Sequence, residues 1–491
     1  MPRIARFPLH LSVALLALCC TAACGAEQLK PLPRTKLLQS SAVDANGTTP
    51  ADTGRAYEIA AALVAALRSV PGDASTSNAS LVQPGAAGIA AAQGQMALQP
   101  TSGSLRSGLV WAKPAQQPTK FGSTDRLTLT GMEDMVLTKG YPLEKHTTLT
   151  ADGYLLTNFR IPSGRTSAAL PGHGAARQPV LLIHGLSLSS TCWVMNAPNV
   201  SLAFILADAG YDVWLYNSRG NTFSRTHALY RIHSPLFWRF SFDEMATSDL
   251  PATIAYIRQV TSAAKVHLVG HSQGASLPLA MLADQPDLSK VTGLSVSLAP
   301  VVYAKYITSN AMLAFCKLGN SSRIYRNLGP QEAAYMAEYT QRAVTAGVCQ
   351  RPLLSRLCEG IMSAMGGGSS YITAEQNQRY WQGWPSPSSF FNALHWSQIA
   401  TEPSPRFRKF DYGPEYNLSR IASPVYLLWG GQDQLAAPRD CALTMARLSA
   451  VGALAGSYEV QSYQHMDFIW DLSVATRAYG KVLEALRRYT V

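Results

Sequence analysis

The stretch Val266-His267-Leu268-Val269-Gly270-His271-Ser272-Gln273-Gly274 decides the fold, because it joins an apolar run to a Gly-x-Ser-x-Gly pentapeptide. A helix-like run, Ala275 to Leu282, follows directly. Glycines at both ends of such a pentapeptide permit a tight, strained turn from a strand into a helix, which lifts the serine above the sheet. The alternative, an ordinary serine at a helix N-terminus, does not explain this strand-turn-helix context. Ser272 is therefore predicted to be a nucleophile.

Apolar runs alternate with helical stretches on both sides of this turn, as in a parallel sheet that helices cover on both faces. A hairpin is predicted where two β-rich runs flank Asp152-Gly153. Between about residues 304 and 406 the strand rhythm stops. The predicted fold class is α/β: an α/β-hydrolase with a mostly parallel central sheet, helices on both faces and an inserted, mainly helical cap. The predicted parallel strands are Val180–Ile183, Val213–Tyr216, Val266–Val269, Leu294–Val296 and Val425–Trp429.

A serine hydroxyl needs a base, and in this fold the partners follow in the order Ser, acid, His. Only His395 and His465 lie downstream of Ser272. His465 comes after the last strand-like run, so it is the predicted base. His395 lies inside the insertion and is expected to pack against aromatic side chains beside Trp396.

The acid is expected in the loop after the run Val425–Trp429, where Asp433 follows Gly430-Gly431-Gln432. An acid there would hold the imidazole tautomer and stabilise the imidazolium. Asp440 is a second candidate. Asp467, two residues after His465, is expected to cap or orient the local backbone.

The transition state also needs two N–H donors for the oxyanion. One is expected from Gln273, directly after the nucleophile, and the other from Leu186, in the turn after the first long strand. His184 is interpreted as shaping that turn, and His271 as a packing residue.

Composition and charge limit the remaining possibilities. The 491 residues carry a formal charge of +11 and contain 14% charged residues, without a nucleic-acid-binding motif. Arg3 and Arg6 precede a short apolar stretch, so residues 1–26 are predicted to be a signal peptide, with acylation at Cys24 as an alternative. Residues 27–125 are expected to be a disordered, low-complexity spacer, and 126–491 the catalytic domain.

The cysteines and sequons agree with export from the cytosol. Five cysteines lie beyond the signal, so a disulfide is expected and at least one thiol stays unpaired within the chain. Glycosylation sequons begin at five asparagines: Asn46, Asn78, Asn199, Asn320 and Asn417.

Several longer motifs resemble the acid lipase family, which includes gastric and lysosomal acid lipases. They cover about residues 131 to 491 and weaken between 310 and 390. The motifs are Gly140-Tyr141-Pro142, Asp152-Gly153-Tyr154, Leu202 to Leu215, Asn217 to Thr222, Phe240 to Met245, Asp249 to Ala252, the pentapeptide, Gly430 to Ala436 and His465 to Trp470.

This resemblance implies hydrolysis of neutral lipid esters at a lipid–water interface, without a metal or organic cofactor. It implies the same triad and oxyanion donors, and a disulfide between Cys349 and Cys358, which match the family's cap cysteines in spacing. The departures from the family are the long spacer, Met466 in place of the usual leucine, and a diverged cap. The cap is the departure that leaves the substrate open.

Three other functions remain open at this point: a small-ester carboxylesterase, an acyltransferase, and a catalytically silent lipid-binding protein on the same fold. The predicted destination is the secretory pathway, either secretion or a lysosome-like compartment, without a stable transmembrane span. Aromatic residues of the insertion would form either an apolar surface for a lipid interface or ordinary cap core. They are Tyr371, Tyr380, Trp381, Trp384, Phe390 and Phe391.

Overall fold

The computed structural model describes most of the chain from Arg126 onward. The predicted signal peptide, the predicted spacer and Cys349 lie outside the described residues. From Leu127 on, the described residues belong to one compact unit. The described residues are 126–165, 177–319, 329–333, 358, 360, 363, 367, 371–372, 374–381 and 383–490.

One sheet of nine strands runs through the described part of the chain. Its strands from β4 to β11 pair in parallel, whereas β1, β2 and the short β5 (Thr226–His227) add an antiparallel edge. The order is β1 (Glu144–Leu149), β2 (Tyr154–Ile161), β4 (Asp212–Leu215), β3 (Pro179–Ile183), β6 (Val266–His271), β7 (Thr292–Leu298), β10 (Val425–Gly430) and β11 (Leu454–Val460), with β5 on β2.

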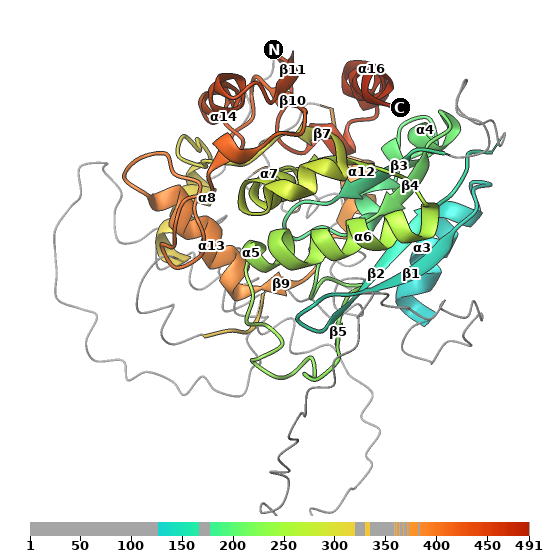
Figure 1. Cartoon of the computed structure of the whole chain (residues 1–491), viewed down its shortest axis with the longest axis horizontal. Coiled ribbons are helices and arrows are strands. Elements are labelled where there is room, and N and C mark those ends of the chain that lie inside the picture. The colour runs from blue at the N-terminus through green and yellow to red at the C-terminus, as the bar shows by residue number, and fades with distance from the viewer. Residues whose placement is uncertain are drawn as a thin grey trace, which may run out of the picture. The chain divides into compact units, whose positions relative to one another are not determined.

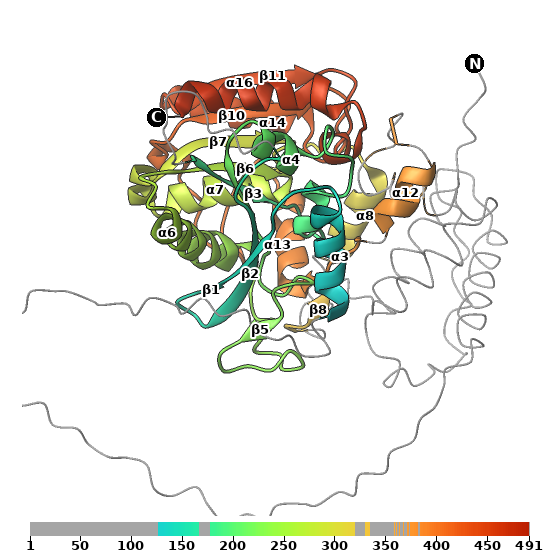
Figure 2. The same ribbon diagram turned by 90° about the vertical axis from the view of Figure 1, so that its right-hand side faces the viewer.

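The apolar runs in the middle of the sheet are buried on both faces because their alternate side chains enter two separate cores. Val180 and Leu182 of β3 pack in one core, and Leu181 and Ile183 pack in the other. Figure 1 shows α6 and α7 side by side across one face, and Figure 2 shows the sheet from the side. The first core includes residues of α4 (Leu202–Asp208) and α16 (Gly480–Tyr489); the second includes residues of α6 (Leu250–Thr261), α7 (Gln273–Asp284) and α14 (Pro438–Ala450).

The predicted mostly parallel sheet with helices on both faces is therefore confirmed, as is the hairpin, whose strands β1 and β2 pair from Glu144 with Arg160 to Leu149 with Leu155. The sequence reading missed β5, β11 and the helix α3 (Arg126–Leu137). Strand β11 is a half-exposed edge strand with Ala455-Gly456-Ser457 at its centre, so it lacks the continuous apolar run of the inner strands.

Between β7 and β10 the described chain is mainly helical, and it also contains a two-stranded sheet of β8 and β9 that was not predicted. The elements there are α8 (Asn310–Gly319), β8 (Glu332–Ala333), α12 (Ala374–Trp381), β9 (Ser388–Ser389), α13 (Phe390–Thr401) and the 3-10 turn η5 (Leu418–Arg420). The remaining short elements are η1 (Ser190–Trp193), α5 (Phe242–Glu244), the π-helical turn η2 (Met245–Asp249), η3 (Pro286–Lys290), α15 (Asp467–Trp470) and the π-helical turn η6 (Ala475–Tyr479).

The turn from β6 into α7 has a strained backbone conformation at Ser272 and needs glycine at two positions. Ser272 has φ 57° and ψ −123°, a strained conformation for a residue with a side chain. A Cβ on Gly270 would lie 1.9 Å from the Gly274 oxygen, and a Cβ on Gly274 would lie 2.2 Å from the Ile183 oxygen. Both glycines are therefore required by close backbone approach, and the second seats the turn against the carboxyl end of β3.

We expect Gly274→Ala to lower the free energy of unfolding by about 2–4 kcal/mol, because the methyl group forces the turn away from β3. The urea midpoint would measure this loss. Gly131→Ala is the matched control: nothing lies within 4 Å of its added methyl, and its position in helix α3 favours alanine. Equal midpoints for the two variants would contradict the close-approach argument.

Candidate active site

The structure brings together the three side chains that the sequence predicts as a triad. His465 Nε2 lies 2.8 Å from Ser272 Oγ, and His465 Nδ1 lies 2.9 Å from Asp433 Oδ2. Ser272 follows β6, Asp433 follows β10, and His465 follows β11, so all three lie at the carboxyl edge of the parallel strands. With the serine hydroxyl and the Nδ1–H as donors, a continuous hydrogen-bonded chain leads from Ser272 through His465 to Asp433, the arrangement that a catalytic triad requires.

Asp433 is held as a buried hydrogen-bond acceptor. Its Oδ1 accepts from the amides of Leu435 and Ala436 at 2.8 and 2.9 Å, which leaves Oδ2 for the imidazole. The second candidate, Asp440, lies in the first turn of α14 and accepts from the Tyr306 amide at 2.8 Å. Its contacts are therefore with the backbone after β7 and not with His465.

The predicted oxyanion donors flank the serine. Gln273 is the first residue of α7, so its N–H has no acceptor within the helix. In the described part of the chain no group accepts from the Leu186 N–H, and Leu186 lines the same cavity as Ser272. Gly185 lies beside the nucleophile, since a Cβ there would be 3.0 Å from Ser272 Cβ. Leu186 and Gln273 therefore both border the cavity at Ser272 with backbone N–H groups that no described group accepts from.

The other histidines near the site are buried in fixed roles. His184 Nδ1 bonds to the Gly185 oxygen at 2.8 Å, and its Nε2 accepts from the Ser218 amide, so the ring ties two loops together. Burial lowers its pKa to about 4, which keeps the ring neutral. His271 Nε2 bonds to the His465 carbonyl oxygen at 3.0 Å and so holds the backbone of the triad histidine.

His395 lies in α13, with its ring stacked on Phe242 at 4.0 Å and its Nε2 bonded to the Arg408 carbonyl oxygen. Burial lowers the pKa of His395 to about 3. The geometry is that of a neutral packing histidine, away from Ser272. Asp467 accepts from the Gln464 amide at 2.7 Å, which shapes the loop before His465.

Above Ser272 lies a cavity with about 860 Å³ of empty space, counting the part open to solvent. Its walls are mainly apolar and come from both the sheet loops and the insertion. The lining side chains from the insertion and the C-terminal loop include Met312, Cys316, Trp384, Trp396, Met466 and Trp470.

A direct hydrogen bond joins the insertion to the turn at Ser272. Trp396 Nε1 of α13 donates to Gln273 Oε1 at 2.6 Å, and the side-chain Nε2 of Gln273 donates to Met245 Sδ at 3.4 Å. The side chain of Gln273 is therefore fixed, and the indole of Trp396 is held as a cavity wall. Sequence reasoning assigned Gln273 only a backbone role, since the contact joins residues 123 positions apart.

Three of the insertion aromatics that could have formed a lipid-facing surface are interior residues. Tyr380, Trp381 and Trp384 are 0%, 2% and 7% exposed. Tyr380 stacks on Trp470 and donates to Asn196 Oδ1 at 2.8 Å. Of the two alternatives for the insertion aromatics, these three residues form ordinary core, and the hypothesis that they form a lipid-facing surface is wrong. Tyr371, Phe390 and Phe391 are half-buried.

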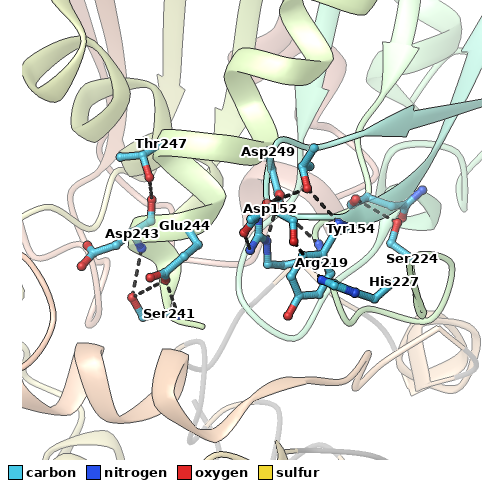
Figure 3. A network of polar contacts seen from close by, with 12 residues as sticks. Asp152, Tyr154, Arg219, Ser224, His227, Ser241, Asp243, Glu244, Thr247 and Asp249 are labelled. Carbon is cyan, nitrogen blue, oxygen red and sulfur yellow. Dashed lines mark hydrogen bonds and ion pairs between the residues drawn. The ribbon is translucent and has the colours of Figure 1, made fainter. Parts of the chain in front are cut away.

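A buried cation holds the loop that follows β4 (Figure 3). Arg219 is 1% exposed, and its guanidinium bonds to the buried Asp249 at 2.6 and 2.9 Å and to Asp152 at 2.5 and 3.0 Å. The guanidinium carbon Cζ of Arg219 lies 4.1 Å from the centre of the Tyr154 ring. Burial opposes the charge, but the two carboxylates raise the pKa of Arg219 above its ordinary value. The sequence motif around Arg219 indicates a family likeness but not these partners, because they lie 67 and 30 residues away in the chain.

Cys358 is disulfide-bonded, while its predicted partner, Cys349, lies outside the described residues. Among the described cysteines, Cys192, Cys316 and Cys441 are buried free thiols.

The described residues contain no group of three or more His, Cys, Asp or Glu arranged to hold a metal ion. Nor does any helix among them reach the length and apolarity needed to cross a membrane.

We expect Asp433→Asn to lower kcat on a soluble ester on the order of 10⁴-fold, with little change in KM. Leu435 and Ala436 would hold the amide oxygen, so the amide nitrogen would face His465 Nδ1 and force the proton onto Nε2. Asp440→Asn is the control and should stay within a few-fold of the parent. A larger loss of kcat in Asp440→Asn than in Asp433→Asn would reverse the assignment of the acid.

The comparisons with known proteins agree with this geometry. Residues 178–472 match the profile of the α/β hydrolase fold, and residues 132–197 match that of the partial α/β-hydrolase lipase region. Gastric triacylglycerol lipase of Bos taurus is 35% identical over 371 residues, which cover 72% of this chain and 90% of that protein. The Homo sapiens gastric lipase is 35% identical over 370 residues, covering 72% and 90%.

Lipase member K of Homo sapiens is 34% identical over 365 residues, covering 71% of this chain and 89% of that protein. The resemblance seen in the sequence motifs is confirmed by these matches. The chain belongs to the acid lipase family of α/β hydrolases and is an ester hydrolase of the lipase type.

Proposed function

We propose that this protein hydrolyses neutral lipid esters, triacylglycerols or sterol esters, through Ser272, His465 and Asp433 at a lipid–water interface. The observation that carries the proposal is the hydrogen-bonded chain Ser272–His465–Asp433 at the floor of a mainly apolar cavity. The chemistry comes from the triad, and the preference for a lipid ester comes from the walls.

Acylation begins with His465 Nε2, which takes the Ser272 proton as the oxygen attacks the ester carbonyl. Asp433 holds the Nδ1–H and stabilises the imidazolium without taking its proton. The amides of Leu186 and Gln273 stabilise the oxyanion, and each such donor is worth roughly 3 kcal/mol of barrier. The imidazolium then protonates the departing alcohol.

Deacylation repeats these steps with water as nucleophile, activated by His465, and releases the fatty acid. An alcohol in place of water would give acyl transfer. The cavity favours a substrate with an apolar acyl chain, because burial of each methylene is worth about 0.8 kcal/mol. Met312, Trp384 and Trp396 supply such walls next to Ser272.

The relatives support a lipid substrate. The match to gastric triacylglycerol lipase of Bos taurus covers 90% of that protein, so it includes nearly all of a triacylglycerol lipase. We further propose that the protein is exported and that Cys358 pairs with Cys349. The disulfide at Cys358 supports both proposals. Exposed sequon asparagines at Asn199 and Asn417 are accessible for glycosylation.

Emulsified triolein and a soluble butyrate ester, assayed side by side, test the substrate class. We expect cleavage of triolein with release of oleate, and loss of at least about 10⁴-fold in kcat for Ser272→Ala, because the nucleophile is absent. Ser276→Ala is the matched control, in helix α7 directly after Ser272; Ser276 Oγ bonds to backbone carbonyls and not to His465.

Cleavage of the butyrate ester alone would overturn the lipase proposal in favour of a small-ester carboxylesterase. Formation of oleate esters in the presence of added alcohol, in preference to oleate, would show an acyltransferase. If the parent cleaves neither ester but binds lipid, the protein is a silent lipid-binding member of the fold. Activity that survives in Ser272→Ala would overturn the assignment of the nucleophile.

A further inference from the structure

Three of the exposed large apolar side chains among the described residues lie on the segment that follows β5. This segment, residues 228–239, is called the basic loop here. Leu229 is 81% exposed and Leu236 is 49% exposed, while Tyr230 is 38% exposed. Figure 1 shows the loop in green, extending below β5. Exposed leucines of this degree on one short segment are typical of a contact surface.

The same loop is cationic. Arg231, His233 and Arg239 are exposed, and the sequence from Thr226 to Ser241 contains no Asp or Glu. Within the described residues the guanidinium groups of Arg231 and Arg239 form no ion pair, in contrast to Arg219 and Arg225, which are both paired. Two unpaired arginines therefore stand beside the exposed leucines.

The exposed residues are held in place from beneath. His227 Nδ1 accepts from the amides of Leu229 and Tyr230 at 2.9 and 3.1 Å, and its Nε2 donates to the Asp152 carbonyl oxygen at 2.8 Å. The His227 ring also stacks on Tyr230 at 4.5 Å. Figure 3 shows His227 beside Asp152, whose carboxylate binds the buried Arg219.

The far end of the loop is tied down as well. Trp238 Nε1 donates to the Ile232 oxygen at 2.7 Å, and Ser389 Oγ of β9 donates to the Trp238 oxygen at 2.5 Å. Leu229 and Leu236 thus project from a loop with fixed ends. Ordering on binding would cost little, since the loop is already built.

The position of the loop relates it to the active site. The chain leaves the carboxyl end of β4, forms β5 against the first residues of β2 and then enters the loop. Ser272 follows the carboxyl end of β6, which is parallel to β4 in the same sheet. Both therefore lie at one edge of the sheet. A surface that binds to this edge brings its lipids toward the cavity.

We infer that the basic loop is a docking surface for an anionic lipid–water interface, with Leu229 and Leu236 inserted among the acyl chains and Arg231 and Arg239 on the anionic head groups. Apolar insertion combined with cationic contact is how proteins bind such surfaces without spanning them. The arginine stems lie along the apolar region while their charges stay at the head groups. In its orientation toward the cavity, the inference rests on the proposed lipase function.

Vesicle binding by the full chain with Ser272→Ala tests the inference, because this variant removes the nucleophile that would attack ester-containing lipids. The vesicles are phosphatidylcholine alone and phosphatidylcholine with about one third phosphatidylglycerol. We expect tighter binding to the anionic vesicles, and a decrease of that binding as salt rises.

Three further variants in that background separate the contributions. Arg231→Gln with Arg239→Gln should weaken binding to anionic vesicles about 25-fold, at about fivefold per arginine, and remove the preference over neutral vesicles. Leu229→Ser with Leu236→Ser should weaken binding to both vesicles at least about tenfold. Val451→Ser with Lys265→Gln changes an exposed apolar and an exposed cationic residue near the opposite edge of the sheet, and should leave binding unchanged.

Thermal melting of each variant checks that folding is retained. Equal binding of the parent to neutral and anionic vesicles, or equal binding of the arginine variant and the parent, would overturn the inference. So would a loop variant that changes the oligomeric state in sedimentation while vesicle binding stays the same, because the loop would then be a contact between copies of the chain. Failure of triolein cleavage by the parent would instead refute the proposed function, which this binding assay does not use.

Discussion

The contact between the turn at Ser272 and the carboxyl end of β3 is the constraint on which the rest of the site depends. With Gly274 against the Ile183 oxygen, the backbone of α7 approaches β3 more closely than any side chain would allow. That approach places Gly185 beside Ser272, since a Cβ on Gly185 would lie 3.0 Å from Ser272 Cβ, so one packing contact sets the loop after β3 against the turn at Ser272. The strained φ of Ser272 persists because β6, β3 and α7 fix it from three sides.

Asp433 and His465 reach this turn from the loops after β10 and β11, the last two strands in the order of the sheet. β10 and β11 place Asp433 and His465 at the same edge, and two backbone amides hold the carboxylate in orientation. His271 then links the two halves, since its ring bonds to the His465 carbonyl oxygen from the residue before the nucleophile. The triad distances therefore depend on sheet geometry and on local hydrogen bonds together.

The insertion and the loop after β4 are joined to this core by buried polar contacts. Trp396 reaches the residue after the nucleophile through one short hydrogen bond, which makes a cavity wall out of an insertion helix. Arg219 joins the hairpin, the loop after β4 and the N-terminus of α6. Removal of one partner of such a buried pair typically costs about 3–5 kcal/mol, so this cluster fixes the base of the basic loop firmly.

Local patterns in the sequence were sufficient to predict the features that depend on residues close together in the chain. The pentapeptide after an apolar run predicted the turn at Ser272, and the chain order of Asp433 and His465 predicted their places at one edge, because parallel strands end together. The inner strands were predicted from continuous apolar runs, whereas β11 was not, since a half-exposed edge strand does not need one.

Tertiary structure alone decided the contacts between distant residues: Trp396 with Gln273, Arg219 with Asp152 and Asp249, and the burial of Tyr380 and Trp381. The physical reason is that an aromatic or charged residue has the same letters in the sequence whether it faces lipid, core or a buried partner. Only the packing of elements far apart in the chain determines which of these surroundings it meets.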